Sequence, residues 1–349
     1  MSFFVTNNNA FGLDISDGGL RLIQMCKKNK KVAIQLYNDI NLPNDCVIEG
    51  EIKNQKVFLD HLNKLLKTHM GHGKISHEVI CSLPESNTFL KQLTIEKCNE
   101  EEVKNKVEEV LPQHLPMAME DLYLDCQIIK TDESTMDILI GASPKQIVDS
   151  YMEILDMAGL IPSILEIEAA AISRLVIEQN GGIQPQIIID MGATRTGLLI
   201  YDENTVKFTV SLPVSGQKIT ELISQTLDLD KEKAEKAKLV CGLDSAKCQG
   251  ALLEIFSETI DDLCVHIQSA MDFYKINFNN KKIEKITLCG GGANFIGIDS
   301  LLQQKLNLKV EIANPFINIA NPNKNYFTPQ RSQSYIAAIG LGLRGICRH

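Results

Sequence analysis

Two short turns in this chain place an acidic residue beside small and hydroxyl-bearing residues, a combination that can bind the phosphates of a nucleotide. Turn N–H groups hydrogen-bond phosphate oxygens, and small residues let the backbone approach those oxygens closely. An acid at the base of such a turn can hold Mg²⁺, usually through the waters of the ion. The predicted phosphate-binding and metal-binding residues are Asp14, Ser16, Asp17, Gly18 and Gly19 in the first turn, and Asp190, Gly192, Ala193 and Thr194 in the second.

Each turn taken alone also fits an ordinary β-turn, in which Asp and Gly are common. A run of glycines favours the nucleotide: Gly290, Gly291 and Gly292 follow the apolar segment 285–289. Three adjacent glycines cost chain entropy with no packing return, so we expect a close approach of the backbone to a ligand, with the adenosine side of a nucleotide as the candidate. Asn294 either caps the next helix or contacts that ligand, and capping is the favoured interpretation.

The strands that must position these residues occur twice in the same order. Each acid ends an apolar strand, and a turn, a returning strand, a second turn and a third strand follow it. The two acids are 176 positions apart, and this repeated order indicates an internal duplication. The predicted strands are 10–16, 20–25 and 32–37 in the first copy, and 186–190, 196–201 and 206–212 in the second.

Apolar residues at helical spacing and flanking capping residues predict the remaining elements. Ser143 is expected to cap a helix whose first position is Pro144 and whose end is marked by Gly159. The other predicted helices are 55–69, 100–110, 168–179, 215–227, 231–240, 252–278, 298–306 and a final one that ends at 346. Further strands are predicted at 77–83, 88–94, 122–129, 136–140, 285–289 and 309–312.

The order of these elements divides the chain into two halves and an insertion. Residues 85–142 have short strands around an acidic helix and read as a small α+β insertion with its own core. The glycines after Asn180 form the expected boundary between the halves. The first half comprises 1–84, 143–180 and 333–349, the insertion is 85–142, and the second half is 181–332 with a helical subdomain at about 228–265.

Composition narrows the function classes. The 349 residues include 44 Asp and Glu against 35 Lys and Arg, and this net charge of −9 argues against a nucleic-acid partner. The longest apolar stretch, 335–343, is far shorter than the roughly twenty residues that span a bilayer. The N-terminus has no signal-peptide pattern. We therefore expect a cytosolic protein of about two domains, without direct membrane insertion, whose ten cysteines are reduced and mostly in the core.

The paired turns, the glycine run and the repeated meander resemble the superfamily of ATP-binding proteins that contains actin, heat-shock chaperones and sugar kinases. Within it, the chain most closely resembles the PilM family of type IV pilus assembly proteins, over about residues 10–346. Each matching stretch is degenerate, but their order and spacing are specific. These stretches are GLDI (12–15), SPKQIVDSY (143–151), AGLIP (158–162), EIEA (166–169), IDMGA (189–193), LPVSG (212–216), SAMDFY (269–274), TLCGGGA (287–293) and IGLGLRG (339–345).

The resemblance implies an α/β, actin-like fold of two related, ribonuclease H-like halves with a small α+β insertion. It also implies that ATP or ADP binds between the halves with Mg²⁺. On that pattern Asp14 and Asp190 approach the metal, and the two turns hold the phosphates. Gly291 and Gly292 then lie near the nucleoside.

Three charged residues take roles from the same resemblance. Arg21 falls where many actin-fold proteins place a phosphate-contacting lysine, although a solvated strand residue is the alternative. Glu235 and Lys238 match an adenosine-contacting pair of the superfamily. The alternating charges of 231–238 fit a solvated helix equally well, so this alternative stays open.

The chain departs from the superfamily at Ser16, where glycine is usual, and at Asp17, where a small residue is usual. A carboxylate beside a triphosphate repels it unless the side chain turns away or Mg²⁺ neutralises it. No residue is recognisable as a general base for water, so at most weak ATP hydrolysis is expected. Residues 340–345 fit the pattern G-x-G-x-x-G, but no acid follows about twenty residues later, which argues against a dinucleotide site.

The resemblance implies a scaffold that docks the cytoplasmic N-terminal tail of a PilN-like inner-membrane protein. The groove would involve the first half and the 85–142 insertion, and the protein would reach the inner face of the membrane through this partner. Contacts with pilus motor ATPases and self-association are further implications. Two alternatives remain: a cell-division protein like FtsA, whose chains end in a basic amphipathic helix, and a small-molecule kinase of the same superfamily.

Overall fold

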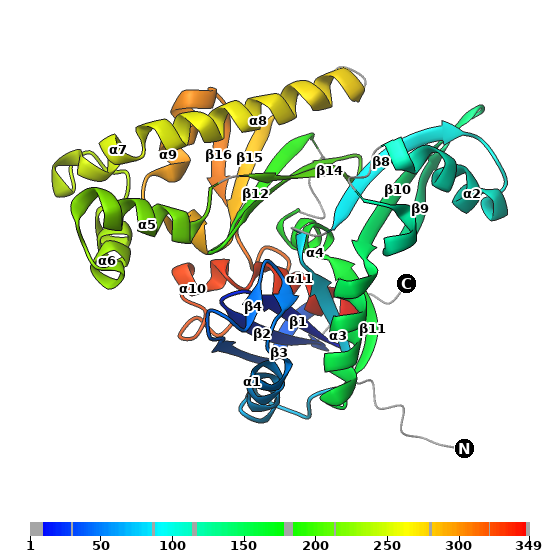
Figure 1. The fold of residues 1–349 in the computed structure, drawn as a ribbon, viewed down its shortest axis with the longest axis horizontal. Coiled ribbons are helices and arrows are strands. Elements are labelled where there is room, and N and C mark those ends of the chain that lie inside the picture. The colour runs from blue at the N-terminus through cyan, green and yellow to red at the C-terminus, as the bar shows by residue number, and fades with distance from the viewer. Residues whose placement is uncertain are drawn as a thin grey trace. The chain divides into compact units, whose positions relative to one another are not determined.

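The computed structural model describes residues 10–28, 31–85, 88–113, 117–177, 184–212, 214–278, 281–320 and 322–346. The chain folds as two compact units (Figure 1). Unit 1 comprises Met1–Gln179, Pro315–Asn323 and Ile336–His349, and unit 2 comprises Asn180–Asn314 and Lys324–Tyr335. The glycine break predicted after Asn180 lies outside the described residues.

The main sheet of unit 1 has the strand order β11-β7-β1-β2-β3-β6. Its first three strands in sequence pair antiparallel and form the predicted meander. β7 pairs parallel with β1, and β11 pairs parallel with β7. The strands are β1 (Phe11–Ser16), β2 (Gly19–Lys28), β3 (Lys31–Asn41), β6 (Met70–Gly71), β7 (Glu78–Leu83) and β11 (Ile161–Ile167).

Unit 2 repeats this arrangement, with strands in the order β16-β15-β12-β13-β14. Again the first three pair antiparallel, the next pairs parallel with the first, and the last pairs parallel with that one. The same topology in both units confirms the predicted duplication. The strands are β12 (Gln186–Met191), β13 (Thr196–Asp202), β14 (Thr205–Leu212), β15 (Lys285–Cys289) and β16 (Lys309–Ile312).

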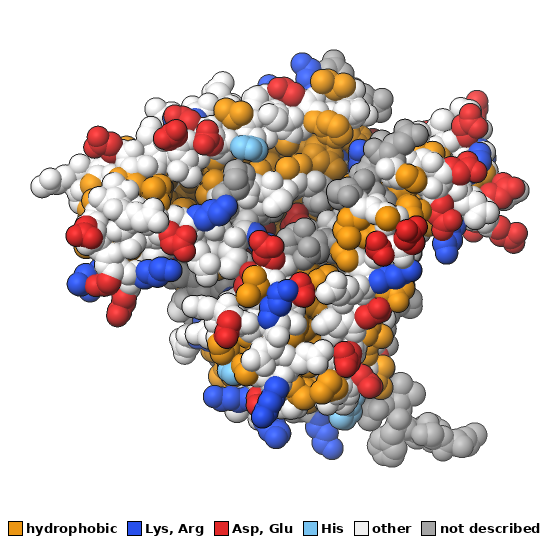
Figure 2. Space-filling model, viewed as in Figure 1, with side chains coloured by type: hydrophobic (Ala, Val, Ile, Leu, Met, Phe, Trp, Pro, Cys, Tyr) orange, Lys and Arg blue, Asp and Glu red, His pale blue; other side chains and the backbone are white. Residues whose placement is uncertain are grey.

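The 85–142 segment contains the short strands and the acidic helix that its sequence predicts. Strands β8 (Phe89–Glu96), β10 (Thr135–Pro144) and β9 (Leu122–Thr131) pair antiparallel in that order, and α2 (Glu100–Val110) packs on them. Figure 2 shows acidic side chains gathered over α2. The small core consists of Ile95, Val103, Val107, Leu111, Met136, Ile138 and Ile140.

Helices α1 (Gln55–Lys67) and α3 (Lys145–Met157) cover the unit 1 sheet and bury Phe58, Leu62 and Tyr151 against it. The Asn54 side chain caps α1 by accepting a hydrogen bond from the N–H of Val57 at 3.2 Å. The helix predicted from 168 is α4 (Glu168–Val176).

The predicted start of α3 is wrong. Ser143 and Pro144 still belong to β10, where they pair with Tyr123 and Leu122 of β9, so the helix begins at Lys145 and Pro144 is its N-cap. The Ser143 hydroxyl therefore does not cap α3. Residues 161–167 form the parallel strand β11. No element was predicted there, because an edge strand of a buried sheet lacks a clear alternation of apolar and polar residues.

The helices of unit 2 pack around the core built on β12, β13 and β15. The helix predicted over 252–278 is divided in two at Phe256, whose buried ring makes an edge contact with Phe295 at 5.7 Å. These helices are α5 (Gly216–Leu227), α6 (Lys231–Cys241), α7 (Ala251–Ile255), α8 (Ser257–Asn277) and α9 (Ile298–Leu306). Unit 2 also contains α10 (Pro329–Gln333).

The G-x-G-x-x-G segment lies in α11 (Ile336–Ile346), a helix buried along its length in unit 1. Its glycines allow close packing of the backbone. A Cβ atom on Gly340 would lie 2.0 Å from the carbonyl oxygen of Ala171 in α4, and one on Gly345 would lie 2.2 Å from that of Ala10. These glycines therefore serve helix packing, which agrees with the argument against a dinucleotide site.

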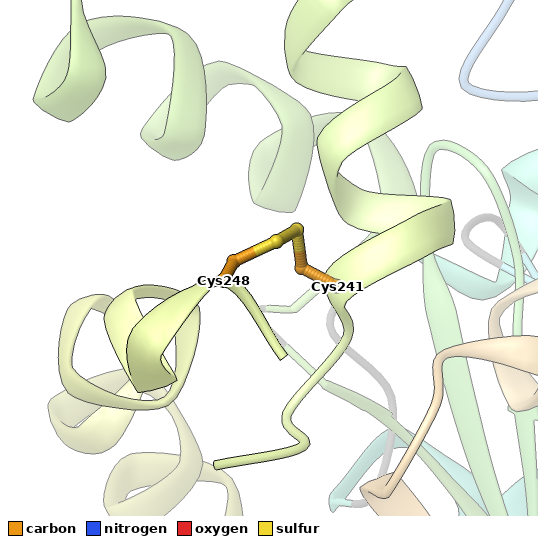
Figure 3. Close-up of a disulfide and its surroundings, with 2 residues drawn as sticks. All are labelled: Cys241 and Cys248. Atoms are coloured by element: carbon orange, nitrogen blue, oxygen red, sulfur yellow. A yellow bond between two sulfur atoms is a disulfide. The ribbon is translucent and has the colours of Figure 1, made fainter. Parts of the chain in front are cut away.

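The expectation that all cysteines are reduced is wrong for one pair. Cys241 and Cys248 form a disulfide (Figure 3). Residue type and spacing did not reveal it, because the fold brings the end of α6 and the following turn together. Among the described residues, no helix is long and apolar enough to cross a membrane.

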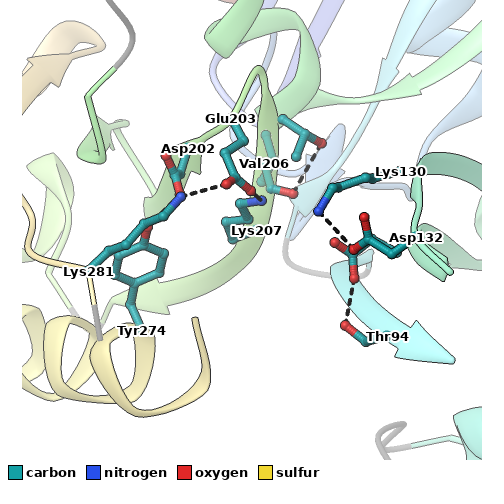
Figure 4. A network of polar contacts seen from close by, with 11 residues as sticks. Thr94, Lys130, Asp132, Asp202, Glu203, Val206, Lys207, Tyr274 and Lys281 are labelled. Atoms are coloured by element: carbon teal, nitrogen blue, oxygen red, sulfur yellow. Dashed lines mark hydrogen bonds and ion pairs between the residues drawn. The ribbon is translucent and has the colours of Figure 1, made fainter. Parts of the chain in front are cut away.

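A partly buried polar network links the turn between β13 and β14 to Tyr274 of α8 and to Lys281 beyond this helix (Figure 4). Lys281 donates to both Asp202 and Glu203 at 2.6 Å, and Tyr274 donates to Asp202 at 2.7 Å. Lys207, only 1% exposed, donates to Glu203 at 3.0 Å. These lysines lower the pKa of Glu203 to about 2.

Candidate functional site

The first predicted turn joins β1 to β2 in unit 1. Asp14, 3% exposed, accepts a hydrogen bond from Arg21 at 3.1 Å and another from the Ser82 hydroxyl at 3.3 Å. Ser16 accepts from Arg21 at 3.3 Å and donates to the Gly19 carbonyl at 2.9 Å. Arg21 is therefore not a solvated strand residue, because its guanidinium donates hydrogen bonds to the side chains of Asp14 and Ser16.

The Asp17 carboxylate turns to the backbone of the neighbouring loop. It accepts hydrogen bonds from the N–H groups of Glu49 at 3.1 Å and Gly50 at 3.0 Å. Gly50 has a φ of +79° and Glu49 a φ of +51°, so this carboxylate supports a tight left-handed turn. A structural role thus explains the unusual acid at position 17.

The second predicted turn joins β12 to β13 in unit 2, and α5 begins against it. The N–H of Gly192 donates to the Arg195 carbonyl at 2.8 Å and closes the turn. The N–H groups of Gly216 and Gln217 donate to the carbonyls of Gly192 and Ala193, at 3.0 and 2.7 Å. The first turn of α5 is thereby fixed to this β-turn. Asp190 lies at the end of β12, next to Cys289 of β15.

A pocket of about 270 Å³ opens between this turn, α5, α6 and the glycine segment. Ligand pockets measure about 300–1,000 Å³, so its size suits part of a larger ligand. Seven of the predicted residues line it, namely Gly192, Ala193, Glu235, Lys238, Gly291, Gly292 and Asn294. It is also lined by Met191, Gly216, Gln217, Ile219, Leu239 and Phe295.

Glu235 and Lys238 face this pocket, so the solvated-helix alternative is wrong for the lysine, whose side chain is only 14% exposed. Lys238 donates to Glu235 at 2.6 Å, to the Thr220 hydroxyl at 2.8 Å and to the Gly216 carbonyl at 3.0 Å. These contacts connect α6 to the first turns of α5. A positive charge thus lies in the pocket wall, held by one carboxylate and two neutral oxygens.

The three glycines do not share one role, and the expectation that they bring no packing return is wrong for two of them. A Cβ atom on Gly290, whose φ is +79°, would lie 2.3 Å from an Asp190 carboxylate oxygen. One on Gly292 would lie 2.7 Å from Cβ of Met191. Both positions are therefore restricted by packing against β12. Only at Gly291 would a Cβ meet nothing within 4 Å among the described residues, so this glycine faces open space.

Asn294 does not cap the next helix, contrary to the favoured interpretation. Gly297, with a φ of +83°, occupies the N-cap position of α9. Asn294 instead ends the short helical turn η5 (Gly291–Asn294), where its amide donates to the carbonyls of Gly291 at 3.2 Å and Gln330 at 2.9 Å.

The remaining predicted residues do not line the pocket. Thr194 belongs to the β12–β13 turn, Asp190 to β12, and Gly290 directly follows β15. The five predicted residues of the first turn and Arg21 are in unit 1. Among the described residues, no group of three or more His, Cys, Asp and Glu side chains could hold a metal by itself.

Sequence reasoning missed the part of the pocket contributed by α5. Gly216, Gln217 and Ile219 follow Ser215, whose hydroxyl caps α5 by accepting from the N–H of Lys218 at 3.3 Å. The Ser-Gly pair signalled a helix start, but only the fold shows that this start meets the β12–β13 turn. Thr196, at the start of β13, has a buried hydroxyl without a hydrogen-bond partner in the described part of the chain, but it does not line the pocket.

A second hollow lies within unit 1, with a volume of about 330 Å³. Its walls come from β9 and β10 of the insertion and from β11, α3 and α11 of the first half. β9 ends the β8-β10-β9 group and β11 ends the main sheet, so two edge strands border it. Lining side chains include Leu90, Tyr123, Leu124, Leu139, Ser143, Val148, Ile164, Ile167 and Arg344. We call this hollow the edge-strand groove.

A family model described as type IV pilus assembly protein PilM matches residues 12–346 of this chain. The cell division protein FtsA of Borreliella burgdorferi is 23% identical over 285 residues, which cover 70% of this chain and 66% of that protein. FtsA of Buchnera aphidicola is 24% identical over 199 residues, 49% of this chain and 46% of that one. The chain thus spans at most 66% of the length of these two relatives.

Solved structures resemble the fold over almost its whole length. A PilM–PilN type IV pilus biogenesis complex superposes with a TM-score of 0.81 at 22% identity and covers 97% of this chain and 98% of that one. The MreB5 protein of Spiroplasma citri bound to ADP superposes with a TM-score of 0.55 at 13% identity, over 97% and 96% of the chains. These similarities confirm the predicted actin-like fold of two α/β halves.

Proposed function

The chain belongs to the type IV pilus assembly protein PilM family, and on that premise we propose that it is a nucleotide-binding scaffold of a type IV pilus or related machine. The pocket of unit 2 is the observation that carries the nucleotide part of the proposal. Seven residues of the nucleotide site predicted from the sequence line this single pocket, including Asn294, for which ligand contact was the less favoured interpretation.

In this proposal the pocket takes the nucleoside of ATP or ADP. Ile219, Leu239 and Phe295 offer apolar surface to the base, and Gly291 lets the backbone approach without a side chain in the way. The β12–β13 turn supplies N–H groups for the phosphates. Mg²⁺ would neutralise the phosphate charge, with Asp190 binding its waters. The MreB5 structure with ADP supports the use of such a fold for nucleotides.

Lys238 gives the sharpest test of the nucleotide site. The variant Lys238→Ala removes the charge from the pocket wall, and calorimetric titration with ATP and Mg²⁺ should show at least tenfold weaker binding. Lys236→Ala is the matched control because Lys236 is an exposed lysine of the same helix. Equal affinity of the two variants, or no ATP binding by the unmodified protein at millimolar concentration, would refute the proposal.

The edge-strand groove is the proposed docking site for the cytoplasmic N-terminal tail of a PilN-type membrane protein. An extended peptide can add to an exposed strand edge, and β9 and β11 both offer one. The Ser143 hydroxyl lies in the groove, is 4% exposed and has no hydrogen-bond partner among the described residues. A bound peptide would satisfy it. Docking in this way would hold the protein at the cytoplasmic face of the inner membrane.

Fluorescence anisotropy with a labelled PilN tail peptide tests the docking site. Ile164→Asp places a charge in the groove and should weaken binding at least tenfold, because an unpaired charge buried under the peptide is costly. Ile161→Asp on the same strand is the control, since Ile161 is 60% exposed and does not line the groove.

Tyr123→Ala is a second groove variant that distinguishes a loss of binding from misfolding. This residue is 47% exposed, so its truncation should leave the fold intact. We expect weaker peptide binding with an unchanged melting temperature. Binding that is insensitive to both Ile164→Asp and Tyr123→Ala would place the tail elsewhere, and an unmodified protein that does not bind the peptide would end the PilN proposal.

A further inference from the structure

The disulfide between Cys241 and Cys248 joins the last residue of α6 to the turn η4 (Cys248–Gly250), which leads into α7 (Figure 3). The two Cα atoms are 5.7 Å apart. Cys241 is 6% exposed, whereas Cys248 is an exposed residue. A reagent in solution can therefore reach the bond from the side of Cys248.

The helix that ends at this disulfide forms one wall of the nucleotide pocket. Glu235, Lys238 and Leu239 lie in its last two turns and line the pocket. The N–H of Gly242, directly after Cys241, donates to the Lys238 carbonyl at 3.2 Å and closes the helix. A restraint on Cys241 is thus a restraint on the turn that presents Lys238.

The residues after Cys241 also contact the segment that follows the glycines of the pocket. The N–H of Leu243 donates to the Ile296 carbonyl at 2.7 Å, and a Cβ atom on Gly242 would lie 2.4 Å from Cβ of Ile296. Ile296 directly follows Phe295, which lines the pocket together with the glycine segment. The disulfide therefore anchors a segment that packs against both walls.

The turn on the other side of the bond has an unfavourable backbone conformation. Cys248, Gln249 and Gly250 have φ values of +47°, +57° and +73° in succession. Two of these are non-glycine residues in the left-handed region, which L-residues adopt only at a cost. Such a turn needs a tether and is expected to relax once the tether is broken.

We propose that the Cys241–Cys248 disulfide is a reversible thiol–disulfide exchange site that holds the nucleotide pocket in shape, and that a dithiol reductant opens it. Breaking the bond releases the last turn of α6 and the 241–250 segment. Lys238 and Leu239 then lose their fixed positions, and nucleotide affinity falls. The site couples the redox state of the surroundings to nucleotide occupancy.

The exchange takes place in two steps. A thiolate of the dithiol attacks the exposed Cys248 sulfur, the S–S bond breaks, and Cys241 leaves as a thiolate that takes a proton from water. The second thiol of the reagent, as its thiolate, then attacks the mixed disulfide and releases Cys248, which is protonated in turn. Two electrons pass from the dithiol to the protein, which gains two thiols, while the reagent becomes a cyclic disulfide. A small disulfide oxidant reverses the reaction.

The effect on nucleotide affinity rests on the proposed function, so the experiment has one readout that needs no nucleotide. Hydrogen–deuterium exchange of the full chain is measured over residues 231–250, with and without a dithiol reductant. ATP affinity with Mg²⁺ is measured on the same two samples. Cys248→Ser mimics the open state, and Cys264→Ser in α8 is the matched control because that cysteine is a free thiol packed on the same core.

We expect reduction to speed exchange over 238–250 and to weaken ATP binding about fivefold or more. Cys248→Ser should show both changes permanently, and Cys264→Ser should still respond to the reductant as the unmodified protein does. Identical exchange in the oxidised and reduced protein would overturn the proposal, as would a pair that stays reduced under a small disulfide oxidant. Faster exchange with unchanged ATP affinity would overturn the coupling. Faster exchange in a protein that binds no ATP in either state would refute the nucleotide function. It would still support the proposal that the disulfide restrains the 238–250 segment.

Discussion

At the scale of single residues, the glycine segment 290–292 shows how one run serves packing and ligand access together. Gly290 and Gly292 have no room for a side chain because β12 lies against them. Gly291 between them faces open space in the pocket. The segment thus lies tightly on β12, the strand that carries Asp190, and it still leaves one position free of side-chain atoms for a ligand.

This difference predicts opposite outcomes for two similar substitutions. Gly290→Ala forces a Cβ atom to within 2.3 Å of an Asp190 oxygen at a φ of +79°, so we expect unfolding in urea to show a loss of about 3 kcal/mol or more. Gly291→Ala should cost less than about 1 kcal/mol and weaken ATP binding instead. Equal stability losses for the two variants would contradict this assignment.

Glu203 predicts a dependence of stability on pH. Hydrogen bonds from Lys281 and Lys207 lower the pKa of this carboxyl from 4.5 to about 2. Its stabilisation is therefore complete above pH 4.5 and is lost as the pH falls towards 2. The Glu203 side chain is 54% exposed, so solvent screening limits the effect to about 1 kcal/mol.

The measurement compares the unfolding free energies of the unmodified protein and Glu203→Gln at pH 6 and pH 3. The variant should be less stable at pH 6, and the gap should narrow at pH 3, because the Glu203 carboxyl of the unfolded chain is protonated below about pH 4.5 while the native carboxylate still resists protonation. A gap that is constant with pH would show that the carboxylate makes no pH-dependent contribution.

At the scale of elements, the first turn of α5 connects helix capping to the pocket. Ser215 is 3% exposed and caps this helix, and the next two residues bind the β12–β13 turn through their N–H groups. Loss of the cap would loosen the turn that carries Gly192 and Ala193. The local stability of one helix end thus determines part of the ligand site.

Two cap substitutions separate these effects. Ser215→Ala and Asn54→Ala each remove a side-chain cap, so each should lower the unfolding free energy by about 1 kcal/mol. Only Ser215→Ala should weaken ATP binding, because α1, which Asn54 caps, contributes nothing to the pocket. Titration of both variants with ATP checks this, and equal affinities would argue against a role of α5 in the site.

At the scale of the whole molecule, two units of the same strand order are completed by segments distant in sequence. α11, at residues 336–346, packs on β1, β2 and α4 in the first unit, and its glycines allow this close contact. The fold of the first unit is therefore complete only when α11 has packed onto it.

Gly340→Ala tests this dependence. The new Cβ atom would lie 2.0 Å from the Ala171 carbonyl oxygen, so α11 must move away from α4, and we expect a loss of about 3 kcal/mol or more. Ala337→Gly in the same helix is the control and should cost only about 1 kcal/mol of helix propensity. Thermal unfolding followed by circular dichroism measures both, and similar melting temperatures would contradict the close-packing role.

The sequence by itself determined the repeated meanders, most helices and the candidate residues, because apolar periodicity, capping residues and glycine turns are local signals. The sequence did not reveal the edge strand β11, the start of α3 or the break at Phe256. Pairing with β7 determines the first, pairing with β9 determines the second, and core packing determines the third.

Only the tertiary structure assembled the pocket, because the β12–β13 turn, the consecutive helices α5 and α6, and the 290–295 segment that line it are separated by long stretches of sequence. In the tertiary structure the Asp17 carboxylate also accepts hydrogen bonds from a backbone loop and Arg21 hydrogen-bonds Asp14. Cys241 and Cys248 form a disulfide there. Residue types can identify groups that are able to bind phosphate, but distances between side chains exist only after distant segments have packed together.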